Sequence, residues 1–200
     1  MSKEITYPIM EQFYTIQGEG FHSGRAAYFL RISGCDVGCV WCDVKESWDI
    51  HSDQEQALEI IKKSVEDSET ELVVVTGGEP AMHDLSPLTQ ALKNNYLAIE
   101  TSGVYPLTGN WHWICFSPKK FKKPHEDIYK QANELKVVVY NQHDLNWAKE
   151  HAEKVNSECL LYLQPEWERE QEMLPAIINF VKENPKWKIS IQTHKYMGIP

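Results

Sequence analysis

Residues 26–42 of the chain read AAYFLRISGCDVGCVWC. The first half, residues 26–33, is short, apolar and rich in aromatic and branched side chains, which is typical of a buried β-strand. The second half holds Cys35, Cys39 and Cys42 within eight positions, with Gly34 and Gly38 beside them. Glycine permits backbone angles that let a short loop turn its side chains towards one centre. This stretch therefore predicts a strand that ends in a loop of three converging cysteines.

The same pattern of a short apolar run recurs along the chain, and amphipathic stretches separate the runs. Strands that alternate with helices indicate parallel β-α units. Roughly seven strands are too few for a complete eight-stranded barrel, which typically needs about 250 residues. We therefore expect residues 1–200 to form one domain, a trimmed and partly open (β/α) barrel, with an open doubly wound sheet as the alternative. The predicted strands are 26–33, 71–76, 96–101, 111–117, 135–140, 159–164 and 187–192, and the predicted helices are 52–65 (from a capping box at 52–55), one that begins at 86–87, 125–132, 144–155 and 170–183.

Unusual polar motifs follow most of the predicted strands. The carboxyl ends of parallel strands meet at one edge of a sheet, and active sites of such folds gather there. Six motifs on one rim are not expected of a purely structural protein, so the sequence predicts a site at this edge. Besides the cysteine loop, the motifs are Gly77-Gly78-Glu79-Pro80, Thr101-Ser102-Gly103, Ser117-Pro118-Lys119, Gln164-Pro165 and Gln192-Thr193-His194.

The three clustered cysteines have the spacing C-x3-C-x2-C. Thiolates are soft ligands that suit iron–sulfur clusters, zinc and copper(I). A structural zinc site needs four ligands, which here requires Asp43 or His51, and a redox dithiol of Cys39 and Cys42 leaves Cys35 unexplained. Three cysteines on a cluster that takes four ligands leave one coordination position open for chemistry. The remaining cysteines, Cys115 and Cys159, lie inside predicted strands and are interpreted as core residues.

The overall composition excludes several classes of function. The chain has a formal net charge of −9 and no long basic tract, so we do not expect direct binding to nucleic acid. It has no long uncharged apolar run, so no membrane span is expected. The N-terminus lacks a basic segment followed by an apolar one, so we expect no secretory signal and a cytoplasmic location.

The cysteine spacing, the aromatic Trp41 before the last cysteine and the Gly-Gly-Glu-Pro motif resemble those of the radical S-adenosylmethionine (SAM) enzymes. The resemblance implies that Cys35, Cys39 and Cys42 hold a [4Fe-4S] cluster whose fourth iron binds SAM. An electron from a donor such as flavodoxin or ferredoxin then cleaves SAM to methionine and a 5′-deoxyadenosyl radical. The residues that the resemblance assigns to SAM are Trp41, Asp43, Gly78, Glu79, Ser102, Ser117, Pro118, Lys119 and Gln164.

Further motifs narrow the resemblance. The segment Gln17-Gly18-Glu19-Gly20, Arg31 in the first predicted strand and the terminal QTHKYMGIP are similar to those of the 7-carboxy-7-deazaguanine synthases. The members of that family are lyases of queuosine biosynthesis. The resemblance implies that the chain converts 6-carboxy-5,6,7,8-tetrahydropterin to 7-carboxy-7-deazaguanine with loss of ammonia. It also implies a homodimer that uses Mg²⁺. Its members re-form SAM after each turnover. The residues that would face the substrate are Ile16, Gln17, Gly18, Glu19, Arg31, Thr76, His194 and Pro200.

Two points stay open at this stage. An arginine in an apolar strand needs a partner, and for Arg31 this is either Glu19 or the substrate. Many family members carry Thr or Ser two positions after the last cysteine as a Mg²⁺ ligand, whereas this chain has Val44, which has no ligand atom. The alternatives to the synthase are a glycyl-radical-enzyme activating enzyme, which shares the cysteine spacing, and a zinc-binding module without catalytic activity.

Overall fold

A computed structural model describes residues 4–200. Residues 1–3 lie outside the described residues, and they begin the segment in which we expect no secretory signal. Nine strands form one open sheet in the order β3-β1-β2-β4-β5-β6-β7-β8-β9. Neighbouring strands from β2 to β9 are parallel, whereas β1 is antiparallel to both β2 and β3. The strands are β1 (Thr6–Ile16), β2 (Ala26–Ile32), β3 (Glu55–Ala57), β4 (Leu72–Gly77), β5 (Tyr96–Thr101), β6 (Trp113–Phe116), β7 (Glu134–Val139), β8 (Leu160–Pro165) and β9 (Trp187–Ile189).

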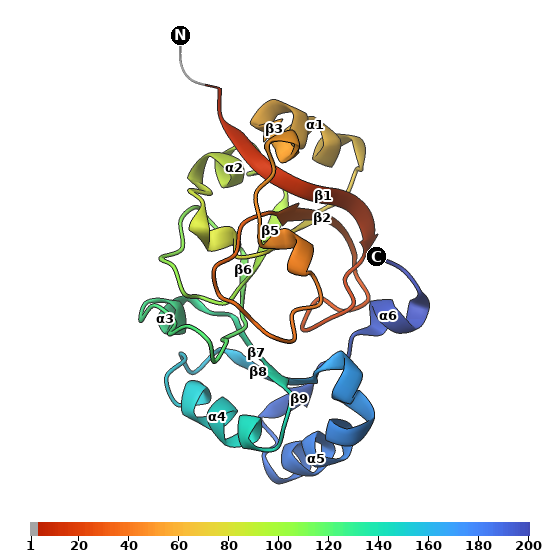
Figure 1. Ribbon diagram of the computed structural model, residues 1–200, viewed down its shortest axis with the longest axis vertical. Coiled ribbons are helices and arrows are strands. Elements are labelled where there is room, and N and C mark those ends of the chain that lie inside the picture. The colour runs from red at the N-terminus through yellow and green to blue at the C-terminus, as the bar shows by residue number, and fades with distance from the viewer. Residues whose placement is uncertain (1–3) are drawn as a thin grey trace.

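The seven parallel strands are those predicted from the apolar runs, and the prediction of a partly open (β/α) barrel is confirmed. The sheet is curved, and its helices lie outside it (Figure 1). None of the helices within residues 4–200 combines the length and the apolar character that crossing a membrane requires. The helices are α1 (Leu58–Asp67), α2 (Ser86–Ala91), α3 (Ile128–Gln131), α4 (His143–Ala152), α5 (Glu170–Glu183) and α6 (Thr193–Met197), with 3-10 turns at Lys45–Ser47, Ser52–Gln54, Pro80–Met82 and Trp167–Arg169.

Three parts of the secondary structure differ from the prediction. The helix expected from residue 52 begins at Leu58, because residues 55–57 pair with β1 as the short strand β3. The helix expected over 125–132 is reduced to α3. Strand β1 and helix α6 were not predicted at all. Strand β1 pairs with β2 from Ile16↔Ala26 to Ile9↔Ile32, and this pairing fixes where the loop at residues 17–20 begins.

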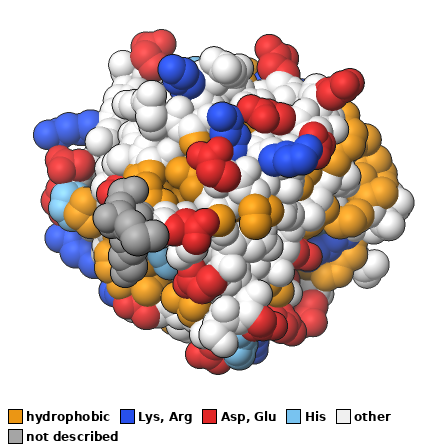
Figure 2. All heavy atoms as spheres, turned by 90° about the horizontal axis from the view of Figure 1, so that it is seen from above, with side chains coloured by type: hydrophobic (Ala, Val, Ile, Leu, Met, Phe, Trp, Pro, Cys, Tyr) orange, Lys and Arg blue, Asp and Glu red, His pale blue; other side chains and the backbone are white. Residues whose placement is uncertain are grey.

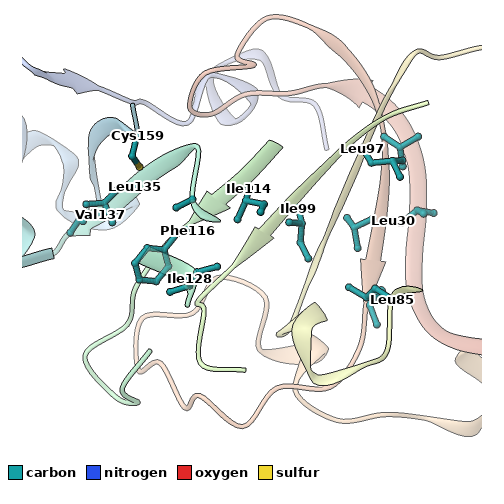
Figure 3. Close-up of a cluster of buried hydrophobic side chains, with 14 of the residues drawn as sticks. Leu30, Leu85, Leu97, Ile99, Ile114, Phe116, Ile128, Leu135, Val137 and Cys159 are labelled. Carbon is teal, nitrogen blue, oxygen red and sulfur yellow. The ribbon is translucent and has the colours of Figure 1, made fainter. Parts of the chain in front are cut away.

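The main hydrophobic core lies between the outer face of the sheet and the helices. Alternate residues of each strand point into it, as the two-residue period of a strand requires. In Figure 3, Phe116 of β6 lies beside Ile128 of α3, and Cys159 lies beside Leu135 and Val137 of β7. The interpretation of Cys159 as a core residue is thereby confirmed.

The intervening strand residues point to the inner face of the sheet. Near the amino-terminal ends of the strands, the inner face is apolar. The side chains there form a second hydrophobic cluster, which includes Ala27, Val74 and Ala98. Towards their carboxyl ends the same alternation places polar side chains on it, and Arg31 is aligned with Thr76 in the sheet. An apolar floor below a polar rim is the arrangement expected of a binding site at this edge.

Candidate active site

The polar rim surrounds a cavity of about 250 Å³. Strand ends and loops that are far apart in the sequence contribute to its wall, as predicted from the positions of the motifs. Two of the residues predicted for the site, Glu79 and Pro118, do not line the cavity. The predicted residues that do line it are Ile16, Gln17, Gly18, Glu19, Arg31, Cys35, Cys39, Trp41, Cys42, Asp43, Thr76, Gly78, Ser102, Ser117, Lys119, Gln164, His194 and Pro200.

The three cysteines of the C-x3-C-x2-C motif all line this cavity. Their loop is tied to the turn that follows it, because Gly34 N donates to Ser47 O at 2.8 Å and Cys35 N donates to Trp48 O at 3.1 Å. Gly38 has φ +75°, and a side chain there would meet no other atom, so glycine is required by the backbone angle alone. Burial raises the pKa of the Cys39 thiol to about 11, so this cysteine stays protonated until a metal displaces the proton.

Three thiols around one cavity fit a cluster that takes three protein ligands. Within residues 4–200, no three His, Cys, Asp or Glu side chains are already drawn together closely enough to hold a metal ion.

The Gly-Gly-Glu-Pro segment follows β4 and lies against the cysteine loop. Gly78 N donates to Ile32 O at 2.9 Å, and a Cβ atom on Gly78 would lie 2.4 Å from the carbonyl oxygen of Gly34. The backbone of the Gly-Gly-Glu-Pro segment is thus in direct contact with the backbone of the cysteine loop. Only glycine allows this approach.

Glu79 is buried and acts within the protein, not in the cavity. Its carboxylate accepts hydrogen bonds from Ala81 N at 3.0 Å, Thr101 Oγ1 at 2.5 Å and Ser102 N at 2.8 Å, and also from the hydroxyl of Ser102. Glu79 therefore holds the Thr101-Ser102-Gly103 loop, so that Ser102 faces the cavity.

Replacing Gly78 with alanine is expected to separate these two loops. The methyl group would overlap backbone atoms of the cysteine loop, which cannot rotate away as a side chain would. We expect iron and sulfide content after reconstitution to fall well below that of the wild type, with a loss of stability of about 1–3 kcal/mol. Chemical denaturation and metal analysis measure both effects. Gly24→Ala is the control for glycine replacement: Gly24 has φ +87°, so alanine strains the backbone there, but its Cβ atom would meet no atom within 4 Å. Equal iron content in all three proteins would contradict the prediction.

On the far side of the cysteine loop, Lys119 and Trp41 lie together. Lys119 Nζ donates to Ser117 Oγ at 2.8 Å and lies 5.1 Å from the centre of the Trp41 ring. The ammonium group is thus fixed at the cavity wall by a hydroxyl and an aromatic face. Gln164 lies on β8 and lines the cavity, and its side-chain oxygen accepts from Ser190 Oγ at 2.8 Å.

A buried lysine of the cavity wall lies between two glutamates. Lys136 of β7 donates to Glu19, and its Nζ lies 3.6 Å from Glu100 Oε1. Gln17 Nε2 and Thr76 Oγ1 also donate to Glu100, at 3.0 and 3.2 Å. Burial by itself would raise the pKa of Glu19, but the charge and hydrogen bond of Lys136 lower it to about 2. Burial likewise opposes the charged form of Lys136, but Glu100 and Glu19 raise its pKa well above the usual value.

Arg31 does not pair with Glu19, so that interpretation is wrong. Its Nε donates to Glu11 Oε1 at 2.5 Å, because Arg31 and Glu11 are aligned on the paired strands β2 and β1. Glu11, the partner of Arg31, lies on strand β1, which was not predicted. Glu19 is paired with Lys136 instead. The side chain of Arg31 still lines the cavity.

Lys136 and Glu100 were missed in the sequence. A signal was present, because both are charged residues within apolar runs (LKVVVY and YLAIET), and a buried charge needs a partner. Arg31 meets the same condition, as a charged residue in an apolar strand. Applied to every strand, this reasoning would have placed Lys136 and Glu100 on the inner face.

The C-terminal segment meets the end of β1 and the loop that follows it beside this network. Thr193 N donates to Gly18 O at 3.0 Å, and a Cβ atom on Gly18 would lie 2.2 Å from His194 Nδ1. Thr15 Oγ1 donates to Pro200 O at 3.3 Å, and Figure 1 shows the C-terminus beside the end of β1. Burial lowers the pKa of His194, so the ring is neutral near pH 7.

The fold and this three-cysteine cavity define an iron–sulfur enzyme of the radical SAM class. The family model described as "4Fe-4S single cluster domain" matches residues 16–160. The chain belongs to the 7-carboxy-7-deazaguanine synthase family, as the following relatives show. A protein named 7-carboxy-7-deazaguanine synthase from Flavobacterium psychrophilum is 54% identical over 96% of this chain and 92% of its own length. Proteins with the same name from Synechocystis sp. and Escherichia coli are 46% and 34% identical, over 98% of this chain and 94% and 100% of their own lengths.

A solved structure agrees with these relatives. The crystal structure of QueE from Escherichia coli superposes with a TM-score of 0.82 at 30% identity and covers 94% of both chains. Membership of the family confirms the resemblance noted in the motifs. The [4Fe-4S] cluster and SAM follow from it as cofactors, and both fit the cavity as described.

The residues after the last cysteine do not fit Mg²⁺. This ion needs a set of oxygen ligands in near-octahedral geometry. Val44 lines the cavity but has no oxygen in its side chain, and the carboxylate of the neighbouring Asp43 is paired with Lys195. We therefore assign no step of the reaction to Mg²⁺ in this chain.

Proposed function

We propose that this chain converts 6-carboxy-5,6,7,8-tetrahydropterin to 7-carboxy-7-deazaguanine, with loss of ammonia, as a step towards queuosine. The observation that carries the proposal is the shared cavity: the three cysteines and the network of Glu19, Lys136 and Glu100 line the same space. A radical enzyme requires its substrate beside its cofactor, and this cavity joins the two regions.

The acidic network suits the hydrogen-rich edge of a pterin ring. A carboxylate has about four acceptor positions. Glu19 accepts from Lys136 and Gln192, and Glu100 from Gln17 and Thr76 with Lys136 nearby, so each keeps acceptor capacity. Lys136 lowers the pKa of Glu19 and so keeps that carboxylate ionised, and ionised acceptors form stronger hydrogen bonds with ring N–H and amino groups. Gln17, Gly18 and Thr76 complete this end of the cavity, and Ile16, Arg31, His194 and Pro200 form the adjoining wall.

The residues around the cysteine loop suit SAM. Once bound, the cluster and SAM supply the one-electron chemistry that begins the reaction. The backbone at Gly78 and the hydroxyl of Ser102 face the polar methionine part, and Lys119 with Ser117 supplies a cation and a hydroxyl. Trp41, Asp43 and Gln164 line the same region, while Glu79 acts indirectly through Ser102 and Pro118 only shapes the loop.

We further propose that residues 1–200 act as one radical SAM domain, since a single sheet runs from β3 to β9. The enzyme would work as a homodimer and accept electrons from flavodoxin or ferredoxin. Its five cysteines are free, which suits the reducing cytoplasm. On the face shown in Figure 2, lysine and arginine side chains are scattered among acidic ones.

Anaerobic turnover tests the proposal. The reconstituted protein is incubated with the carboxytetrahydropterin, SAM and dithionite, and products are separated by chromatography with mass detection. We expect 7-carboxy-7-deazaguanine to form only when SAM and reductant are both present, and SAM to be conserved. An unchanged pterin with steady cleavage of SAM would reject the proposal and favour a glycyl-radical activating enzyme. A colourless protein with stoichiometric zinc would favour the zinc module.

A further inference from the structure

The cavity wall next to the last cysteine carries an ammonium group at the place where the sequence resemblance implied a divalent cation. Lys195 of α6, Asp43 and Val44 all line the cavity there. Val44 offers no oxygen, and the carboxylate of the neighbouring Asp43 is paired with Lys195, so this stretch of wall supplies no side-chain oxygen outside an ion pair. The positive charge at this point of the wall comes from the chain itself.

The position of Lys195 is set by two contacts from separate parts of the chain. Its Nζ lies 3.2 Å from Asp43 Oδ2 and 5.0 Å from the centre of the Trp167 ring. The side chain is only 22% exposed. A cation held by a carboxylate and an aromatic face is fixed in direction even though an ammonium has a flexible stem.

Lys195 also retains capacity to bind a further anion. An ammonium has three donors, and among residues 4–200 only Asp43 accepts from one of them. Asp43 is 60% exposed, so the pair is of the weak, solvated kind, which a second carboxylate can join or replace with little loss.

The other lysines and arginine of the cavity wall are engaged elsewhere. Lys136 is held by Glu19 and Glu100, and Lys119 lies at Ser117 and Trp41. Arg31 gives its Nε to Glu11 but keeps its terminal nitrogens. Lys119 is assigned to the SAM region. Of the two cations that remain, Lys195 has the more exposed carboxylate partner, 60% for Asp43 against 45% for Glu11 at Arg31, and Arg31 is the second one able to share an anion.

We propose that the ammonium group of Lys195 replaces the divalent cation in this chain and binds the carboxylate of the pterin substrate. This inference rests on the proposed function, because it takes the carboxylated heterocycle as the ligand. The consequence is an enzyme whose affinity for that carboxylate does not depend on Mg²⁺. Charge-assisted hydrogen bonds of this kind change affinity by about tenfold or more.

Binding of two matched ligands tests Lys195 without turnover. The reconstituted protein with SAM is titrated with 7-carboxy-7-deazaguanine and with 7-deazaguanine, which lacks the carboxylate, in EDTA and in excess MgCl₂. The wild type is expected to prefer the carboxylated ligand equally in both buffers. Lys195→Met is expected to lose about tenfold in affinity for the carboxylated ligand and to bind 7-deazaguanine unchanged. Lys195→Arg, which keeps the charge, is expected to retain most of the preference.

Lys188→Met is the matched control. Lys188 lies on β9, packs over the Tyr162 ring and is not part of the cavity wall, so its replacement should change neither affinity. Thermal unfolding checks that each variant is folded. A wild-type preference that requires Mg²⁺, or a Lys195→Met variant with the wild-type preference, would overturn the role of Lys195 alone. Failure of the wild type to bind either ligand would overturn the proposed function, and this inference with it.

Discussion

Replacing Cys39 with alanine is expected to abolish the cluster and reduce product formation to background. Two thiols remain in the Cys39→Ala variant, and a cluster that takes three protein ligands then has a second exposed iron. Anaerobic reconstitution followed by iron and sulfide analysis, visible absorption and the turnover assay measures the change. The protein itself should remain folded, because the cysteine loop lies at the edge of the cavity and outside both hydrophobic clusters.

Cys159→Ala provides the control for the loss of a thiol. Cys159 is buried in the main core beside Leu135 and Val137 (Figure 3), and it is remote from the cavity wall. Its replacement should lower stability by about 1 kcal/mol and leave iron content and turnover as in the wild type. Full iron content with turnover in Cys39→Ala, or loss of the cluster in Cys159→Ala, would contradict the assignment of the ligands.

Replacing Lys136 with methionine is expected to cause the largest loss of stability. The change leaves Glu19 and Glu100 as carboxylates without their shared counter-ion, and Glu19 is only 14% exposed. Removing one partner of a buried ion pair typically destabilises a protein by about 3–5 kcal/mol. Urea denaturation at neutral pH measures the difference, and binding of 7-carboxy-7-deazaguanine should also weaken.

The loss of stability caused by Lys136→Met should become smaller as the pH falls. Lys136 lowers the pKa of Glu19 from 4.5 to about 2, against the effect of burial. The stabilisation from this pair is therefore complete above pH 4.5 and disappears as the pH falls towards 2. The difference between wild type and Lys136→Met should shrink over that range. Lys136→Met combined with Glu19→Gln should recover part of the stability at neutral pH, because one unpaired charge is removed. An equal difference at every pH would show that packing, not charge, explains the effect.

The parallel part of the fold was predictable because each buried strand is a short apolar run of its own. Strand β1 was not, because its sequence, TYPIMEQFYTI, mixes polar and apolar residues and its partners β2 and β3 lie on both sides of the cysteine loop. Pairing over such distances leaves no local pattern. The capping box at residues 52–55 failed for the same reason, since pairing with β1 overrode the local preference for a helix.

The site was predictable as a list of residues more than as a set of contacts. The rule that parallel strands end at one edge brought Cys35, Gly78, Ser117 and Gln164 into one cavity. It did not say which charges would pair. Arg31 has Glu11 as its partner and Glu19 has Lys136, and both choices depend on register across strands. Glu79 looked like a cofactor ligand, but its carboxylate is fully used by hydrogen bonds within the protein.

An incomplete barrel leaves two sheet edges open, and exposed edges invite neighbouring molecules to add strands and aggregate. In this chain the edge strands β3 and β9 have only three residues each, and they carry the charged, exposed side chains of Glu55 and Lys188. Such short, charged edges offer few unpaired backbone groups to another chain. The protein should therefore remain dispersed at high concentration, although its sheet never closes.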